Sequence, residues 1–218
     1  MRLIFRIVIF GPPNAGKSTL LRRIYRLYRE ASLHEIRYLG GGPKTGIDFC
    51  AFQIGDFKYE VYAPPSASSI RIFRNKLVKN ADGVIFVIPA GEENVEQTAS
   101  FMLELKRLLF EKHGEQAKNF PVIYAVSGLN GVAMSGIQHI AEKLNLPQDA
   151  IIMAISMDSE RDIRELFGTI TTLASLRRLD PKTYYVELER LRQESKMRIK
   201  AAKPVSYTHL RAHETEAD

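Results

Sequence analysis

The chain has 218 residues, of which 45% are apolar and 26% are charged, and these proportions predict one globular α/β domain with a short appendage. No apolar run approaches the roughly 20 residues that a bilayer span needs, and a single cysteine, Cys50, excludes an internal disulfide and a cysteine metal cluster, as is typical of the cytoplasm. The net charge of +6 gathers on two helix faces without an RNA-binding signature, so we expect no nucleic-acid partner.

The first predicted element is a buried strand over residues 3–10, which is apolar almost throughout apart from Arg6. Residues 11–18 follow it and read Gly-Pro-Pro-Asn-Ala-Gly-Lys-Ser, a full match to the phosphate-loop pattern G-x-x-x-x-G-K-[ST]. Glycines at this spacing let backbone N–H groups approach an anion at the start of the next helix. An ordinary Gly/Pro turn is the alternative, but the strand, loop and helix context favours a nucleotide site.

The loop and the first helical turn supply the candidate nucleotide ligands. We expect Lys17 to reach the β- and γ-phosphates, where it would act in catalysis, and Ser18 to bind Mg²⁺ through its hydroxyl. The residues predicted to contact the nucleotide here are Gly11, Pro12, Asn14, Ala15, Gly16, Lys17, Ser18 and Thr19.

The rest of the chain alternates between helical and strand patterns. A stripe of apolar residues predicts a helix over residues 17–31, and the glycine-rich residues 39–46 predict a loop. Alternation around the turn Gly55-Asp56 predicts a β-hairpin over residues 47–62. Later helices and strands are predicted over residues 70–78, 83–88, 94–113, 120–126, 134–144, 150–155 and 159–176. This order predicts a three-layer α/β fold whose sheet is mostly parallel, with one antiparallel edge hairpin.

Two helices carry apolar stripes whose surroundings the sequence leaves open. The helix at residues 70–78 is expected to bury Ile70, Phe73, Leu77 and Val78. Another helix begins at Asp180-Pro181, an N-cap followed by a first-turn proline, and runs to about residue 202. Its thin stripe is interrupted by Ser195, so it either docks or projects, and we consider a role in oligomerisation or partner binding.

The chain therefore divides into a nucleotide-binding domain over residues 1–178 and a C-terminal helical extension over residues 180–203. Residues 204–218 resemble translated sequencing-adapter read-through, and we interpret them as a non-native tail that has no part in the fold.

A phosphate loop alone does not separate kinases, ATPases and GTPases. The order of helix, glycine-rich loop and β-hairpin, with Thr45 just before the hairpin, resembles the Ras-like small GTPases over about residues 3–176. Within that group the chain is most similar to the bacterial gliding-motility type through residues 62–87, where a proline-containing loop without an opening aspartate leads to Asn80-Ala81-Asp82-Gly83.

The resemblance implies a cytoplasmic molecular switch that binds GTP or GDP with Mg²⁺ and acts on protein effectors. Thr45 would be a second Mg²⁺ ligand, would sense the γ-phosphate and would take part in catalysis. Nucleotide-dependent ordering of residues 32–46 and 63–75 would be the output.

The second GTPase motif, Asp-x-x-Gly, is replaced here. At its place stand Tyr62 or Ala63 and then Pro64 and Pro65, and a proline has no N–H to offer the γ-phosphate. Ser66 occupies the place of a water-orienting glutamine. Hydrolysis is therefore expected to be slow or to depend on a partner. Asp48 is a candidate to replace the missing Mg²⁺ aspartate, and the alternative is that it faces solvent on its strand.

The base-reading motif is also altered. Residues 127–130 read Ser-Gly-Leu-Asn where Asn-Lys-x-Asp is expected, so Asn130 offers guanine one acceptor and one donor in place of two acceptors. This mismatch costs roughly 1 to 3 kcal/mol, and Asn130 would pair as well with adenine or a 2-oxo purine. A plain turn over residues 127–131 is the alternative. Ser156 is a partial match to the last GTPase motif, which also contacts the base.

Three functions remain open at this level. The first is a GTP-binding switch with slow or partner-dependent hydrolysis. The second is a pseudo-GTPase scaffold that does not cycle, which the altered motifs favour and the intact Lys17-Ser18 pair opposes. The third is a phosphate-loop protein that uses another purine nucleotide such as ATP, for example a kinase.

Overall fold

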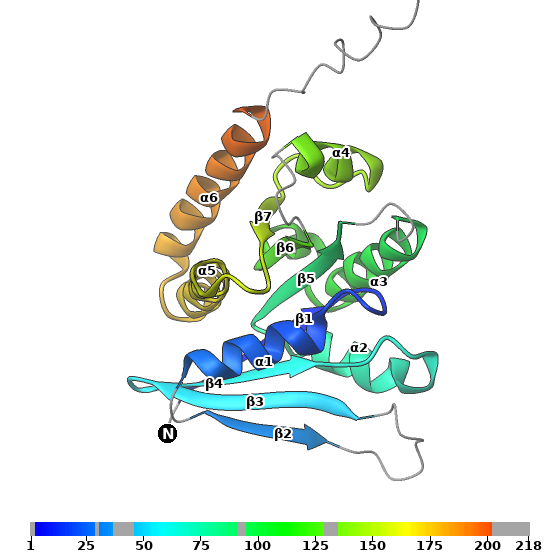
Figure 1. Cartoon of the computed structure of the whole chain (residues 1–218). Coiled ribbons are helices and arrows are strands. Elements are labelled where there is room, and N and C mark those ends of the chain that lie inside the picture. The colour runs from blue at the N-terminus through cyan, green and yellow to red at the C-terminus, as the bar shows by residue number, and fades with distance from the viewer. Residues whose placement is uncertain (1–2, 29–30, 37–45, 91–94, 129–134, 202–218) are drawn as a thin grey trace, which may run out of the picture.

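A computed structural model describes residues 3–28, 31–36, 46–90, 95–128 and 135–201. Its centre is a seven-stranded sheet with the order β2-β3-β4-β1-β5-β6-β7 (Figure 1). The strands are β1 Leu3–Phe10, β2 Ser32–Ile36, β3 Ile47–Ile54, β4 Phe57–Ala63, β5 Gly83–Pro89, β6 Val122–Ser127 and β7 Ile151–Ile155. The helices are α1 Lys17–Leu27, α2 Arg71–Lys79, α3 Val95–His113, α4 Ser135–Lys143, α5 Glu160–Leu179 and α6 Pro181–Ala201, with 3-10 turns η1 Ser68–Ile70 and η3 Gly114–Asn119.

The sheet is parallel except at one side. Strand β1 pairs in parallel with β4 and β5, and β6 and β7 continue in the same direction, whereas β3 runs antiparallel between β2 and β4. The predicted three-layer, mostly parallel α/β fold is confirmed. The prediction of the antiparallel edge was wrong in one respect, because it placed the β-hairpin outermost. The first helix ends at Leu27, and Ser32–Ile36 forms a further outer strand that pairs with β3.

The side chains of β1 point alternately into two cores. Phe5, Ile7 and Ile9 pack with α1 and α5 on one face, and Val8 and Phe10 pack with α2 and α3 on the other. All five are fully buried. A strand that is covered on both faces must be apolar on both, which is why its sequence hardly alternates.

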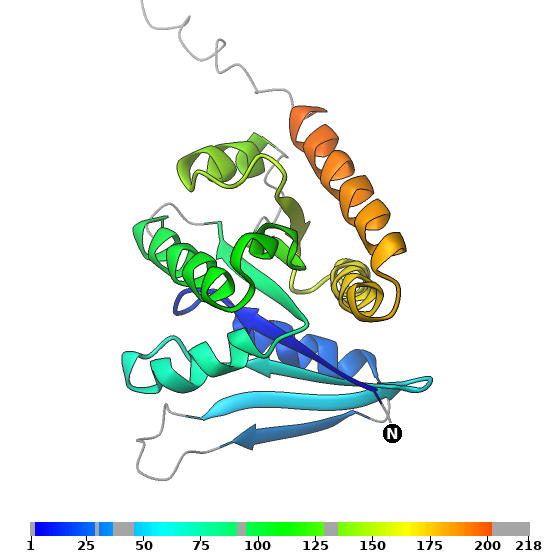
Figure 2. The same ribbon diagram turned by 180° about the vertical axis from the view of Figure 1, so that it is seen from behind.

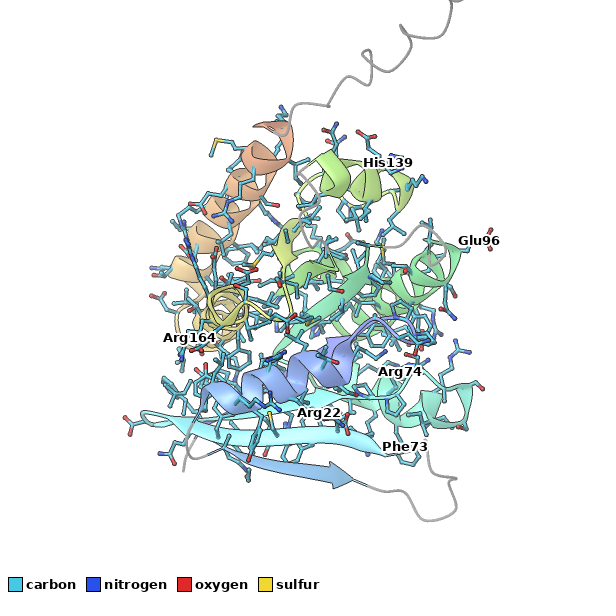
Figure 3. The ribbon with its side chains drawn as sticks, in the orientation of Figure 1. Arg22, Phe73, Arg74, Glu96, His139 and Arg164 are labelled. Carbon is cyan, nitrogen blue, oxygen red and sulfur yellow. The ribbon has the colours of Figure 1, made fainter. Side chains whose placement is uncertain are left out.

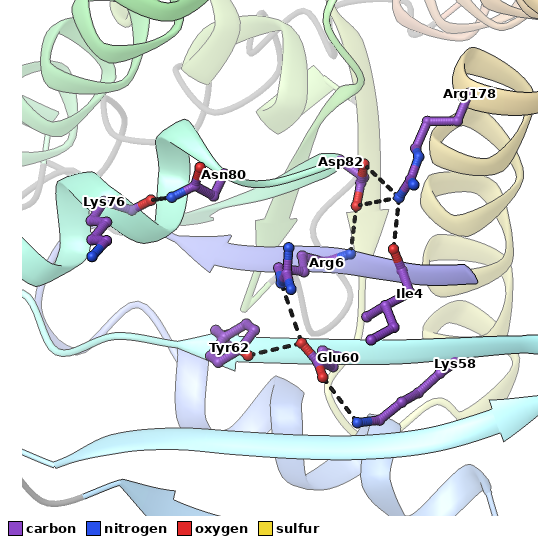
Figure 4. Close-up of polar contacts among 9 residues, drawn as sticks. All are labelled: Ile4, Arg6, Lys58, Glu60, Tyr62, Lys76, Asn80, Asp82 and Arg178. Atoms are coloured by element: carbon purple, nitrogen blue, oxygen red, sulfur yellow. Dashed lines mark hydrogen bonds and ion pairs between the residues drawn. The ribbon is translucent and has the colours of Figure 1, made fainter. Parts of the chain in front are cut away.

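Arg6 is the one charged residue in this strand, and its contacts with Glu60 and Asp82 are drawn in Figure 4. Its Nε lies 3.3 Å from Oε2 of Glu60 on β4, and its backbone N–H donates to Asp82 at 2.8 Å. Burial alone would raise the pKa of Glu60, but hydrogen bonds from Lys58 and Tyr62 outweigh it and lower that pKa. Arg6, which interrupts the apolar sequence of the first strand, is therefore there to make polar contacts with β4 and with Asp82.

Helix α6 docks on the domain. Its residues Tyr184, Leu188 and Ser195 are 2%, 3% and 4% exposed. The Ser195 hydroxyl accepts a hydrogen bond from the Ile152 N–H at 2.9 Å and lies 3.4 Å from the Ile152 carbonyl. Because β7 is the last strand of the sheet, this hydroxyl satisfies backbone groups that have no further strand to pair with. Ser195 is thus part of the docked face and does not interrupt it.

The helix at residues 70–78 buries Ile70 and Val78 as predicted, with Leu77 partly buried against the core, but Arg74 takes the buried place that was predicted for Phe73. Ile70, Arg74 and Val78 are 3%, 3% and 0% exposed, whereas Phe73 is 42% exposed.

The glycine-rich residues 39–45 and the tail at 204–218 lie outside the described residues. Among the helices that the structure does describe, none is long and apolar enough to cross a membrane.

Candidate nucleotide-binding site

The predicted phosphate loop connects the end of β1 to the start of α1. Three of its residues have positive φ: Gly11 at 147°, Asn14 at 59° and Gly16 at 87°. A Cβ on Gly11 would lie 2.6 Å from the Val87 carbonyl oxygen, so only glycine allows the loop to pass this close to β5. Gly16 takes the left-handed conformation at the N-cap of α1. The glycines therefore shape the loop as the sequence predicted.

The loop offers unused backbone donors. Pro12 and Pro13 have no N–H, and the N–H groups of Asn14, Ala15 and Gly16 donate to no backbone acceptor in the part of the chain that the structure describes. Successive free N–H groups in a left-handed turn form an anion-binding concavity, and the N-terminus of α1 adds a partial positive charge to it. This geometry suits a phosphate group.

Lys17 is buried in this loop without an anionic partner. Its ammonium donates to the carbonyls of Gly11 at 3.1 Å and Pro12 at 2.5 Å and to the Ser66 hydroxyl at 2.7 Å. The side chain is 9% exposed, and burial, together with the nearby charge of Arg74, lowers its pKa from 10.5 to about 8. Its three partners are all neutral, so the positive charge remains uncompensated among the described residues.

The segment after β4 is clamped between the phosphate loop and α2. Ser66 also donates to the Gly11 carbonyl at 3.0 Å. Arg74, on α2 (Figure 3), donates through Nη1 to the Pro65 carbonyl at 3.4 Å and to the Ala67 carbonyl at 3.1 Å. Residues 65–67 are therefore tied on one side to the phosphate loop and on the other to α2.

Arg74 is in turn fixed by the carboxylate of Glu104 on α3. Its Nη2 lies 2.9 and 3.0 Å from the two Glu104 oxygens, and its guanidinium stands over the Phe101 ring at 5.2 Å. Its Nε has no hydrogen-bond partner in the described structure. Sequence reasoning missed Arg74, although a charge four residues from both Ile70 and Val78 lies on the buried stripe of a helix and is a signal that it could have used.

Two other loops meet the phosphate loop from the neighbouring strands. The Ser127 hydroxyl, at the end of β6, lies 3.4 Å from the carbonyls of Ala15 and Ile88. After β7, the Ser156 N–H donates to Asp162 at 2.9 Å, and Met157 would be the nearest neighbour of a Cβ on Gly16, at 3.1 Å. Ser127, the first residue of the segment predicted to read the base, therefore braces the phosphate loop, a role the sequence did not indicate.

The remaining predicted residues are only partly placed. Ser18 is half-buried and Thr19 exposed at the start of α1, and the Ser18 hydroxyl donates no hydrogen bond to a described residue. Thr45 and Asn130 lie outside the described residues. Asp48 pairs with Ala63, so it is at the same end of the sheet as the phosphate loop, but it makes no hydrogen bond to Ser18.

This geometry is compatible with Mg²⁺. Over the residues that the structure describes, no three His, Cys, Asp or Glu side chains gather to hold a metal by themselves. Mg²⁺ beside a nucleotide needs few protein ligands, because phosphates and water complete its shell. The free Ser18 hydroxyl next to the N–H groups of the loop suits that arrangement.

No protein-family model matches this sequence, and no curated protein matches it either. Among solved structures, the crystal structure of the G domain of the T. maritima FeoB iron transporter is similar, with a TM-score of 0.52 and 19% sequence identity. The match covers 78% of this chain and 98% of that one. The chain has a P-loop GTPase-like α/β fold. At this identity the likeness supports the fold and does not single out the gliding-motility type.

Proposed function

We propose that this P-loop GTPase-like protein is a cytoplasmic, nucleotide-dependent switch that binds GTP or GDP with Mg²⁺. The observation that carries the proposal is Lys17, a buried ammonium with three neutral partners in a loop of free N–H groups. An uncompensated buried charge is costly, and a bound phosphate would compensate it. The P-loop GTPase fold favours a guanine nucleotide over other purines, although the altered residue Asn130 argues for testing that choice.

Lys17 also provides a way for the ligand to move a loop. The same Nζ that would meet a phosphate now holds the Ser66 hydroxyl at 2.7 Å. A phosphate would compete for this donor, and Ser66 would lose its charged partner. Arg74 holds the neighbouring carbonyls of Pro65 and Ala67, so a shift of this segment would be passed to α2. We infer that α2 and the segment before it form the surface that protein effectors read.

Magnesium would be held by Ser18, with Thr45 as the second protein ligand, and it would neutralise phosphate charge. Hydrolysis is the weaker part of this function. Pro64 and Pro65 have no N–H for the γ-phosphate, and Ser66 cannot orient water as a glutamine would. We therefore propose slow intrinsic hydrolysis that a partner protein accelerates.

The first test is the identity of the nucleotide. Purified protein is denatured and any released nucleotide is identified by chromatography. Refolded or nucleotide-free protein is then titrated with GTP, GDP, ATP and XTP in the presence of Mg²⁺. Lys17→Ala is the test variant, and Lys112→Ala, which removes an exposed lysine from α3, is the matched control. We expect guanine nucleotides to bind to the parent and control proteins, and Lys17→Ala to lose most of the affinity.

A second titration follows the loop. A fluorophore on a cysteine introduced at Ile72, which is 82% exposed on α2, reports the surroundings of that helix. We expect its signal to differ between GTP and GDP. If GTP and GDP both bind tightly but give the same fluorescence, the protein binds nucleotide without acting as a switch.

A scaffold that does not cycle is the second candidate. The absence of N–H groups at Pro64 and Pro65 and the tight clamp on residues 65–67 favour it. In that case no triphosphate binds with an affinity that depends on Lys17, and the folded protein still recognises its partners. Selective binding of ATP would instead support the third hypothesis.

A further inference from the structure

A cavity of about 370 Å³ lies between α3, η3, β6 and α6, far from the phosphate loop. It is lined by Val122 and Ile151, which begin β6 and β7, whereas the phosphate loop meets Ser127 at the other end of β6. Figure 2 shows this side of the molecule, with the green helix α3 in front of the sheet and the orange helix α6 beside it. The volume is in the range of small-molecule sites.

The described residues of helix α4 do not reach this cavity. With nine residues the helix spans about 13 Å. Its Ile137 lies near Ile152 and Ala154 of β7 and near Ile199 of α6. This contact is on the side of β7 away from its first residue, Ile151, which lines the cavity. No described residue of α4 lines the cavity, so the beginnings of β6 and β7 are left between α3 and α6 without a helix over them.

The walls are apolar, and one tyrosine hydroxyl among them has no protein partner in the described structure. Leu105, Leu109, Phe120 and Leu188 are buried side chains of the wall. Tyr124 also lines the cavity and is 7% exposed, but its hydroxyl makes no hydrogen bond with any residue that the structure describes. The ring is buried, but the hydroxyl oxygen is not among the sealed atoms that lack a partner, so it is accessible to water or to a ligand in the cavity. Burial, with the charge of Asp149, raises the pKa of Tyr124 to about 12, so the hydroxyl remains a donor at neutral pH.

The rim carries more positive than negative charge. Lys106, Lys118 and Arg192 line it, with Asp149 as the one acidic lining residue. Arg192 pairs with Asp149 at 3.1 Å and also donates to the Lys118 carbonyl at 2.7 Å. The two lysine ammonium groups form no ion pair with a described residue. After the Arg192 pair is set aside, the rim retains two positive charges.

We propose that this cavity binds a medium-chain fatty acid or a similar amphipathic carboxylate. The alkyl chain would lie against the leucines and Phe120, and the carboxylate would accept a hydrogen bond from Tyr124 and be neutralised by Lys106 and Lys118. An apolar pocket with a few polar groups at one side is how proteins orient such ligands. The proposal does not depend on the nucleotide function, because the two sites are at opposite ends of the sheet.

The test is a titration of the full chain with decanoate below its micelle concentration, followed by NMR chemical shifts of the backbone amides. Decanol, which has the same chain without the charge, is the ligand control. We expect decanoate to bind with shifts confined to the residues around the cavity, and decanol to bind at least tenfold more weakly. Binding that spreads over the surface, or no binding at all, would overturn the proposal.

Three variants separate the parts of the site. Tyr124→Phe keeps the ring and should weaken decanoate binding roughly tenfold, as for one lost hydrogen bond to a charged group. Lys118→Ala should weaken it severalfold, while Lys112→Ala, the same change at an exposed lysine outside the cavity, should not. Ala117→Phe fills the cavity and should abolish binding.

Thermal unfolding of each variant checks the fold. If Ala117→Phe is unstable, Tyr124→Phe and Lys118→Ala decide the question, because neither leaves a cavity in the core. Unchanged affinity in both of these variants, or equal affinity for decanoate and decanol, would mean that the cavity does not recognise a carboxylate.

Discussion

Replacing Lys17 by methionine should remove a pH-dependent part of the stability of this protein. The folded protein holds this lysine with a pKa of about 8, against 10.5 for the free side chain, because burial disfavours the ammonium. Below pH 8 the lysine is protonated in both states, and the penalty on the folded state is constant. Between pH 8 and 10.5 the unfolded chain keeps a proton that the folded protein has released, so the free energy of unfolding rises with pH.

The size of this rise follows from the two pKa values. Integrated from pH 7 to pH 10, the contribution of Lys17 to the free energy of unfolding is about 2 to 3 kcal/mol. Other groups act in the opposite direction: the pKa values of Cys50 and Tyr62 are raised to about 12, which lowers stability as the pH rises above their ordinary values. Both proteins share these groups, so their effect cancels in the difference between the parent and Lys17→Met.

The assay is urea unfolding of both proteins at pH 7, 8, 9 and 10 in a buffer without phosphate or sulfate. The parent should gain about 2 to 3 kcal/mol over Lys17→Met between the lowest and the highest pH. Lys112→Met controls for the loss of a positive charge at an exposed position. A difference between the parent and Lys17→Met that stays constant from pH 7 to 10 would refute the idea that Lys17 is held as an uncompensated buried charge.

Three further changes test the packing around the site. Gly11→Ala places a Cβ 2.6 Å from the Val87 carbonyl at a φ of 147°, and should cost about 2 kcal/mol or more, measured by thermal unfolding; a variant as stable as the parent would contradict this close approach. Arg74→Met leaves the partly buried carboxylate of Glu104 without its main partner and should cost about 3 kcal/mol in urea unfolding, with partial recovery when Glu104 is also neutralised. Ser195→Ala should cost about 1 to 3 kcal/mol and speed hydrogen exchange at the Ile152 amide, whereas unchanged exchange there would mean that α6 does not protect the last strand.

The candidate site was readable from the sequence where it is local. Residues 11–18 are contiguous, their glycines need positive φ, and the apolar strand before them is continuous, so the loop and the fold class could both be predicted. The outer strand Ser32–Ile36 was missed because its five residues carry little signal of their own and are held by pairing with β3. Pairing partners are not visible in the sequence of one strand.

The partners of Lys17 were decided by the tertiary structure. Ser66 is 49 residues away from it along the chain, and Arg74 reaches Glu104 across 30 residues. The sequence predicted that Ser66 stands in the place of a glutamine and that Lys17 belongs to a phosphate loop, but it did not predict that the two side chains meet. Contacts of this kind form only when helices and loops pack over the sheet. They are stabilised by burial and by charge, and residues adjacent in sequence do not determine which side chains meet.

The same division applies to the C-terminal helix. Its start at Asp180-Pro181 is a local signal, because an N-cap and a first-turn proline act on the backbone beside them. Its docking was undecidable from its own residues, since a thin apolar stripe with a serine in it fits a projecting helix as well. The assembled sheet decides whether the helix docks. Strand β7 is the last strand, so the backbone N–H and carbonyl of Ile152 have no further strand to pair with, and the buried hydroxyl of Ser195 bonds to them.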